Sequence, residues 1–265
     1  MTSIVLQNVF QDYTNGKTVT RVIDDISLTI NGPSINMLLG PSGCGKSTLL
    51  RMMGGVRPQQ VKSPSAGAVF VDTVYVDDQL NEAVTVFQKY SNRPDLTVRQ
   101  NVEFPFTLKL WKNSAPKAEI KQRIDEIITE VGLADKQNLY PYQLSGGQQQ
   151  RVAIAMAMVL RPKILLMDEP FGALDPQTRE EMQKLLVKLY TEFKCTVIFV
   201  THDIDEAVTV GDRVILMSSH PGKIADDFTI DHPRPVRSRE WVRTGEGQQY
   251  YQRIAKHLKK SELAL

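Results

Sequence analysis

A glycine-rich segment carries the residues best suited to hold a phosphate chain. It consists of Gly40, Pro41, Ser42, Gly43, Cys44, Gly45, Lys46, Ser47 and Thr48. Glycines let the backbone curl so that its N–H groups point at phosphate oxygens. Lys46 supplies a mobile cation for the terminal phosphates, and the Ser47 hydroxyl is a ligand for Mg²⁺. The spacing therefore predicts a P-loop that binds a nucleotide.

Polar residues follow two other apolar runs. Residues 164–167 are followed by Asp168 and Glu169, and residues 197–200 end shortly before His202. Such runs are typical of central parallel strands, and carboxylates at their ends are costly unless a cation meets them. A magnesium nucleotide would meet them. We expect Asp168 to hold the water shell of the metal, Glu169 to polarise the attacking water, and His202 to bind the γ-phosphate and orient Glu169.

The elements around these residues place them at one sheet edge. Residues 35–39 predict a buried strand before the P-loop, and residues 47–53 predict a helix after it, whose N-terminus favours an anion. A further strand is expected over 84–87, ending at Gln88. The amide of Gln88 can reach Mg²⁺ through its oxygen and a water through its nitrogen. Ligands bind at the carboxyl edge of open α/β sheets, so we expect a shared site there.

A second glycine motif follows about a hundred residues later. It reads Leu144, Ser145, Gly146, Gly147 and Gln148, and it precedes a mostly apolar helix that we expect to begin near Gln148. Free N–H groups and the dipole at that helix end would face an anion. The motif has no obvious use within its own subunit. Together with the P-loop it indicates an ATPase that works as a pair.

Two more helices are predicted from pattern alone. Apolar residues from 120 to 131 fall on one helical face, and Gly132 is placed to end that helix. Asp175 and Pro176 form a cap and first-turn pair for a second helix with an apolar stripe from Met182 to Phe193. We expect the first of these helices, together with the second glycine motif, to form a helical part inserted between strand-rich segments.

In their order and spacing these residues resemble the nucleotide-binding subunit of ABC transporters over nearly the whole chain. The matching parts are Walker A (40–48), the Q-loop (Gln88), the LSGGQ signature (144–148), Walker B (164–169), the D-loop (173–175) and the switch histidine (His202). The resemblance implies that two subunits sandwich two ATP molecules head to tail. Ser145 and Gly147 of one copy then cap the γ-phosphate held by Lys46 of the other, and Tyr13 stacks on adenine. The nucleotide-binding residues implied also include Gly146, Gln148, Asp168 and Asp175.

The resemblance also implies a fold and domain limits. We expect an α/β P-loop NTPase core, with a mostly parallel sheet flanked by helices on both faces and an antiparallel β part. A single ABC ATPase domain would span residues 1–265, with an inserted α-helical subdomain at about 89–160. A basic C-terminal tail and helix would occupy about 221–265.

Two short segments narrow the resemblance to importers. Residues 218–224 and 231–235 are similar to subunits of nitrate, sulfonate and taurine importers. This implies an ATP hydrolase that uses Mg²⁺ and works with transmembrane permease subunits and a separate extracytoplasmic solute-binding protein. It would lie peripherally at the cytoplasmic face of the inner membrane. The solute is left open, as is whether the second ATPase subunit is identical or a paralogue.

Composition bounds the alternatives. The chain of 265 residues is 42% hydrophobic and 23% charged, with a net charge of +2. That charge is too small to indicate a nucleic-acid partner. The longest apolar run, 152–160, is far shorter than the ~20 residues that span a bilayer. Its two cysteines, Cys44 and Cys195, form no disulfide framework. A soluble ABC-type ATPase acting on nucleic acid or ribosomes remains an alternative, as does a P-loop kinase, which would need no LSGGQ.

The tail beyond Pro221 is rich in arginine and lysine and poor in acidic residues. Tyr250, Ile254 and Leu258 predict a closing amphipathic helix. The basic residues predict either a solvated face on a docked tail or a contact with a transmembrane partner or anionic lipid.

Overall fold

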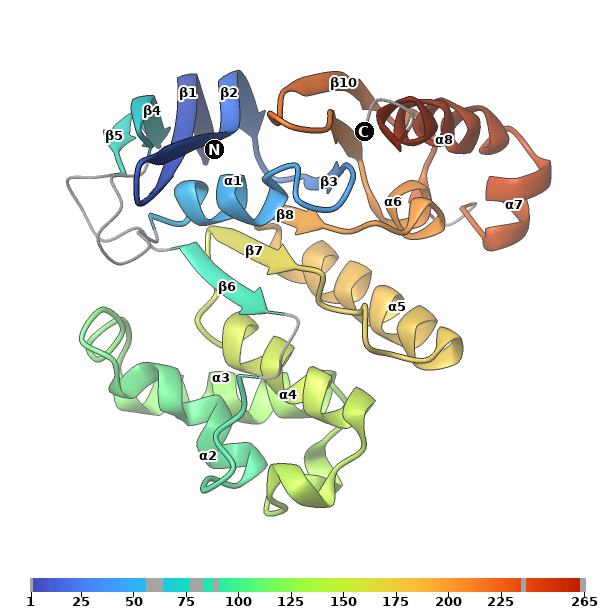
Figure 1. The fold of residues 1–265 in the computed structure, drawn as a ribbon. Coiled ribbons are helices and arrows are strands. Elements are labelled where there is room, and N and C mark those ends of the chain that lie inside the picture. Colours follow the sequence, from blue (N-terminus) through green and yellow to red (C-terminus); the bar gives the residue numbers. More distant parts are fainter. Residues whose placement is uncertain (1, 56–63, 77–82, 88–90, 235–236, 263–265) are drawn as a thin grey trace. The chain divides into compact units, whose positions relative to one another are not determined.

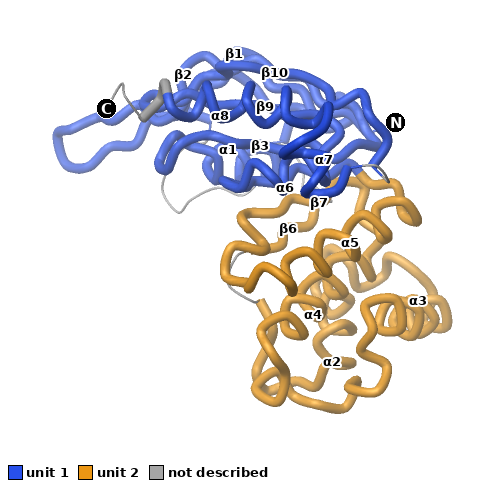
Figure 2. Tube along the Cα trace, turned by 90° about the vertical axis from the view of Figure 1, so that its right-hand side faces the viewer, with its two compact units in different colours: residues 1–81, 196–265 blue, residues 82–195 orange. Residues whose placement is uncertain are grey.

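The structure is a computed structural model (Figure 1), which describes residues 2–55, 64–76, 83–87, 91–234 and 237–262. Gln88 lies outside the described residues. The chain divides into unit 1, which is Met1–Asn81 with Thr196–Leu265, and unit 2, which is Glu82–Cys195 (Figure 2). In the part of the chain that the structure describes, no helix has the length and apolar character needed to cross a membrane.

Unit 1 contains an antiparallel sheet and a set of mostly parallel strands. Its strands are β1 (Ser3–Asn15), β2 (Thr18–Asn31), β3 (Ile35–Leu39), β4 (Ala66–Val71), β5 (Val74–Tyr75), β8 (Thr196–Val200), β9 (Arg213–Met217) and β10 (Ile224–Thr229). The antiparallel sheet has the order β2-β1-β4-β5. Strand β3 pairs in parallel with both β8 and β9, and β10 pairs with β9 in the antiparallel sense.

The helices of unit 1 cover these strands. They are α1 (Lys46–Met53), α6 (Ile204–Val210), α7 (Arg239–Thr244) and α8 (Gln248–Glu262). Helix α1 contacts β4 of the antiparallel sheet and β8 of the parallel strands, so it lies between the two (Figure 1). Strands β3 and β8 are buried along their whole length, as their mostly apolar sequences predict. This places the segment between β3 and α1 at the end of a rigid, buried strand.

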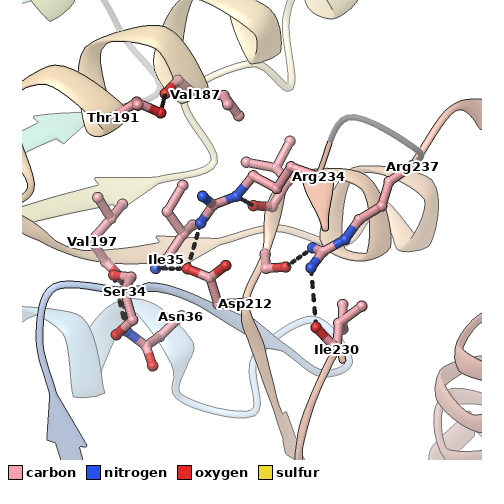
Figure 3. A network of polar contacts seen from close by, with 12 residues as sticks. Ser34, Ile35, Asn36, Val187, Thr191, Val197, Asp212, Ile230, Arg234 and Arg237 are labelled. Atoms are coloured by element: carbon pink, nitrogen blue, oxygen red, sulfur yellow. Dashed lines mark hydrogen bonds and ion pairs between the residues drawn. The ribbon is translucent and has the colours of Figure 1, made fainter. Parts of the chain in front are cut away.

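The C-terminal tail is fastened to the strand that leads into the P-loop (Figure 3). Asp212 accepts a hydrogen bond of 2.8 Å from the Ile35 N–H at the start of β3, and it also pairs with Arg234. Arg237, 5% exposed, donates to the carbonyls of Gly211, Ile230 and His232. Burial lowers the pKa of Arg237. The tail is docked, but this arginine is buried rather than part of a solvated basic face.

Unit 2 combines a strand pair with most of the helices. Strands β6 (Ala83–Phe87) and β7 (Ile164–Asp168) pair in parallel. The helical elements are α2 (Val98–Glu103), η1 (Phe104–Thr107), α3 (Lys117–Glu130), η2 (Ala134–Lys136), η3 (Pro141–Gln143), α4 (Gly146–Met158) and α5 (Pro176–Phe193). Gly132, just beyond α3, has φ +71°, as its predicted role in ending that helix requires. The helical subdomain limits of about 89–160 stay a prediction.

Candidate active site

The segment between β3 and α1 is a tight loop that needs glycine. Gly43 has φ +76° and Gly45 has φ +99°, both in the range that favours residues without a Cβ. A Cβ on Gly45 would also lie 2.5 Å from Ile23 Cδ1. Gly45 is the N-cap of α1 and brings no side-chain cap, so the first turn presents backbone N–H groups. Ser42 and Gly43 are exposed at the tip of the loop.

The Lys46 ammonium lies inside this loop. Its Nζ donates hydrogen bonds of 2.8 Å to the Gly40 carbonyl and 2.9 Å to the Pro41 carbonyl. The side chain is 7% exposed and lies 4.0 Å from Cys44 Sγ. Burial raises the pKa of the Cys44 thiol, and the nearby ammonium opposes that rise. An ammonium held by two backbone carbonyls of a glycine-rich loop is placed where it can meet a phosphate chain.

Neighbouring elements bring further predicted residues to the loop. Ser47 and Thr48 are half-buried in the first turn of α1. On β2, Val22 approaches the loop, since a Cβ on Gly45 would lie 3.1 Å from Val22 Cγ1. Tyr13 is half-buried on β1, in the stretch that pairs with β2. Strand β2 therefore passes beside the loop at Val22, and Tyr13 lies on the antiparallel partner of that strand.

His202 follows β8 on a short structured turn. The Asp203 N–H donates to Thr201 Oγ1 at 3.0 Å, and Asp203 caps α6 by accepting from the Glu206 N–H at 3.1 Å. Between these two anchored neighbours, His202 is exposed. Strand and helix thus fix the backbone on both sides of the imidazole.

In unit 2 the strand β7 ends in the predicted carboxylates. Its first four residues are buried and Asp168 is half-buried. Glu169 has φ +46°, a left-handed conformation that is uncommon for a residue other than glycine. The Gly172 N–H donates to the Glu169 carbonyl at 3.2 Å, which closes the turn. Strained backbone of this kind, which costs about 1–3 kcal/mol, concentrates at functional sites.

The second glycine motif forms the N-terminus of α4. Ser145 is the N-cap: its Oγ accepts from the Gln148 N–H at 3.3 Å, and the Ser145 N–H donates to Gln148 Oε1 at 3.0 Å. This reciprocal pair is a capping box. The helix begins at Gly146, two residues before the expected start near Gln148, because the cap is Ser145 and both glycines lie in the first turn. Ser145 and Gly146 are exposed.

Gly147 of this motif packs against the first turn of α5. A Cβ on Gly147 would lie 2.4 Å from Thr178 Cγ2, and the Thr178 N–H donates to Asp175 Oδ1 at 3.0 Å. That hydrogen bond lowers the pKa of Asp175. The structure therefore brings the residues of the signature and of the predicted D-loop together within unit 2. Sequence reasoning missed Thr178, because no local pattern relates it to Gly147.

Comparison with known proteins gives these motifs a family. The ABC transporter family matches residues 23–172. An ABC transporter ATP-binding protein of Methanocaldococcus jannaschii is 43% identical over 83% of this chain and 79% of its own length. The bicarbonate transport ATP-binding protein CmpD of Synechocystis sp. is 37% identical over 94% of this chain and 85% of its own length. The chain belongs to the ABC transporter family.

A solved relative supports both the fold and the chemistry of this ABC ATPase. The dimeric structure of the ATP-binding cassette MJ0796 bound to ADP and Pi matches with a TM-score of 0.73 and 34% identity. The match covers 87% of this chain and 100% of that one. The α/β P-loop NTPase fold is confirmed, and the chain is an ATP-binding, ATP-hydrolysing protein. The role of each site residue stays a prediction.

Mg²⁺ suits the donors that this ABC ATPase offers. Among the described residues, no group of at least three His, Cys, Asp or Glu side chains is arranged to hold a metal ion. Magnesium keeps most of its ligands as water and phosphate oxygen, so it needs no such cluster. A hydroxyl such as that of Ser47, beside a loop whose shape can hold phosphate, fits this requirement.

Sequence reasoning also missed a segment that packs against the P-loop. A Cβ on Gly222 would lie 2.0 Å from the Cys44 carbonyl oxygen, and one on Gly40 would lie 2.8 Å from the Met217 carbonyl oxygen. The sequence of residues 218–224 resembles that of importer subunits, but it does not indicate that Gly222 packs against the P-loop.

Proposed function

We propose that this ABC ATPase powers import of a small solute as a head-to-tail pair that encloses two ATP molecules. The observation that carries the proposal is the exposed tip of α4, where Ser145 and Gly146 stand at a helix N-terminus that favours an anion. Such a tip suits the γ-phosphate of a nucleotide held by another copy. The dimeric state named for the MJ0796 cassette supports the same arrangement.

The P-loop and Tyr13 together would bind the nucleotide. Lys46 and the loop amides bind the phosphates, and Tyr13 stacks on the adenine. The ammonium inside the loop and the positive φ angles of its glycines fit that ligand. Ser47, Gln88 and Asp168 would hold Mg²⁺, which when bound offsets the charge of the phosphates.

Hydrolysis needs a base and a frame for the terminal phosphate. Glu169 activates the attacking water, and His202 holds the γ-phosphate and Glu169 in register. Ser145 and Gly147 of the second copy cap the γ-phosphate, and Asp175 lies at the contact between copies. In this chain Gly147 and Asp175 both contact Thr178. A displacement of either residue would therefore be passed to the other through Thr178.

The transport role rests on the family and on short motifs. Residues 218–224 and 231–235 resemble importer subunits, and similar proteins include CmpD, named for bicarbonate transport, and NrtC, named for nitrate import. PotA and CysA, named for spermidine/putrescine and sulfate/thiosulfate import, are similar too. We infer a nitrate, sulfonate or taurine type of solute, and peripheral attachment to permease subunits at the cytoplasmic face of the inner membrane. A separate extracytoplasmic protein would capture the solute.

The Glu169→Gln variant tests the enzymatic part. It should bind ATP with unchanged affinity, hydrolyse it at least ~100-fold more slowly, and elute as a dimer with ATP. Glu240 is exposed on helix α7, so Glu240→Gln is the matched control and should hydrolyse normally. Normal hydrolysis by the Glu169 variant would refute its role. Purification from cells in mild detergent tests the transport part: a permease supports it, whereas nucleic acid or no partner contradicts it.

Loss of the chain in cells tests the solute class. A strain lacking it should fail to grow on nitrate as sole nitrogen source, or on taurine or an alkanesulfonate as sole sulfur source. Growth on all three would contradict the proposed nitrate, sulfonate or taurine solute class, but it would not affect the assignment as an ATPase.

A further inference from the structure

The turn between β9 and β10 lies directly on the phosphate loop. We call residues 218–223 the β9–β10 turn. Its Gly222 N–H donates to the Val22 carbonyl at 2.8 Å, and its carbonyl accepts from the Asp24 N–H at 3.0 Å. These bonds join the turn to β2, and the close approach of Gly222 to the Cys44 carbonyl joins it to the loop. The β9–β10 turn therefore packs directly against the P-loop.

Further contacts hold the shape of the turn. The Ser218 N–H donates to the Lys223 carbonyl at 2.9 Å, and the Lys223 N–H donates to Ser218 Oγ at 3.2 Å. The Lys223 ammonium lies 2.7 Å from an Asp24 carboxylate oxygen, and this contact lowers the pKa of Asp24. Both ends of the turn are thus anchored, so its tip keeps one position relative to the loop.

His220 occupies that tip and faces Gly43. A Cβ on Gly43 would lie 3.1 Å from His220 Nε2 and 3.2 Å from its Cε1, so the imidazole edge approaches the loop where the backbone has no side chain. Both residues are exposed. An imidazole carries at least one N–H in either protonation state. Lys46, in contrast, is held on the inside of the loop by the Gly40 and Pro41 carbonyls.

We propose that His220 is a further nucleotide-binding residue, which donates a hydrogen bond from its imidazole to the phosphate chain held by the loop. It approaches the loop from outside at Gly43, while Lys46 acts from within. The proposal rests on the nucleotide site described above. The part of His220 that faces Gly43 is the ring edge formed by Nε2 and Cε1, so a ring nitrogen lies within reach of a ligand held at this point of the loop.

Three substitutions separate hydrogen bonding from packing. His220→Phe keeps the ring volume without a donor, His220→Gln keeps a donor without the ring, and His220→Arg keeps a donor with a permanent charge. Affinities for ADP, ATP and adenosine are measured on the full chain by fluorescent-nucleotide displacement. Loss of one hydrogen bond to a charged group should weaken ADP and ATP binding about tenfold in His220→Phe. His220→Gln and His220→Arg should stay within about threefold of the wild type, and adenosine affinity should not change.

Two controls distinguish the proposal from the site on which it rests. His257→Phe removes a histidine whose Nε2 lies 3.3 Å from Asp226 in the tail, and it should leave all affinities unchanged. Lys46→Ala should weaken ADP binding strongly. If Lys46→Ala binds ADP normally, the nucleotide site itself is wrong. If Lys46→Ala fails while His220→Phe binds ADP normally, the inference on His220 alone is wrong.

A measurement on the unmodified protein adds a readout that packing would not give. The ring signals of His220, assigned by their loss in His220→Phe, should shift in NMR spectra on addition of ADP and not of adenosine. Equal weakening in the Phe and Gln variants, or ring signals that ignore ADP, would reduce His220 to a packing role and overturn the proposal.

Discussion

Helices α1 and α4 both start beside glycines, yet their N-termini are built in opposite ways. At α1 the N-cap is Gly45 with φ +99°, and no side chain caps the helix. At α4 the N-cap is Ser145, and a complete capping box with Gln148 satisfies backbone groups on both sides. At α1 no side chain accepts from the first turn, whereas at α4 Ser145 accepts from one first-turn N–H group, that of Gln148.

This difference indicates different roles for the N-termini of α1 and α4. The P-loop depends on glycine conformations and on a lysine held by the loop's own carbonyls, so it is built around what it binds. The tip of α4 is held by its own capping box, so its backbone shape does not depend on a ligand. Because the Ser145 oxygen accepts from the Gln148 N–H, its hydroxyl proton can point outward to a phosphate without breaking the cap. A second copy could therefore close over ATP without rebuilding this helix.

Gly45→Ala should show the largest effect, because the α1 end has no tolerance for a Cβ. The variant combines an unfavourable φ with a contact of 2.5 Å to Ile23 Cδ1. We expect a loss of about 2–4 kcal/mol in the free energy of unfolding and at least tenfold weaker ADP binding. Denaturant titration and fluorescent-nucleotide binding measure the two.

Gly16→Ala is the control for that change. Gly16 has φ +61° but no atom within 4 Å of an added Cβ, so it isolates backbone strain from crowding. It should cost about 1–2 kcal/mol and leave ADP binding intact. If Gly45→Ala were no worse than Gly16→Ala, the claim that the α1 end is specially constrained would fall.

Ser145→Ala should have a smaller effect on stability, with a second effect on activity. Loss of the cap costs about 1 kcal/mol, which is about 2–4 °C in Tm for a chain of this size. Thr97→Ala is the matched control, because Thr97 caps α2 through the same kind of capping box with Gln100 in the same unit. Both variants should lose similar stability, while ATPase activity falls about tenfold in Ser145→Ala alone. Equal activity loss in both would remove the special role of the α4 tip.

Much of the fold around these two helix ends could be predicted from the sequence. The mostly apolar runs before the P-loop and before Asp168 predicted the limits of β3 and β7 to within a residue, because a strand buried on both faces is rich in apolar residues. Asp175 and Pro176 marked the start of α5 because cap and first-turn preferences are local. The motif order likewise placed the P-loop, the signature and His202 at element ends.

What could not be predicted depends on residues far apart in the chain. The bond from the Ile35 N–H to Asp212 joins positions 177 residues apart, and His220 reaches Gly43 across a similar separation. Neither has a periodic or local signature. Arg237 looked like one of many tail cations, and its burial arises from three backbone carbonyls that the fold brings around it. Local pattern fixes elements, whereas such contacts follow from how the elements pack.

Gln148→Glu should show the smallest effect and is the sharpest test of the α4 end. The Gln148 oxygen is turned back to the Ser145 N–H at 3.0 Å, and a carboxylate there would accept the same bond and favour the positive end of the helix dipole. We expect a gain of about 0.3–0.5 kcal/mol in the free energy of unfolding. ATPase activity should stay within about twofold of the wild type, because the side chain serves the cap rather than the nucleotide. If stability rises as expected while ATP-dependent dimer formation collapses, the new charge must face the phosphate of the neighbouring copy. The α4 tip would then bind nucleotide through Gln148 as well as Ser145, and the two helix ends would be less different than their caps indicate.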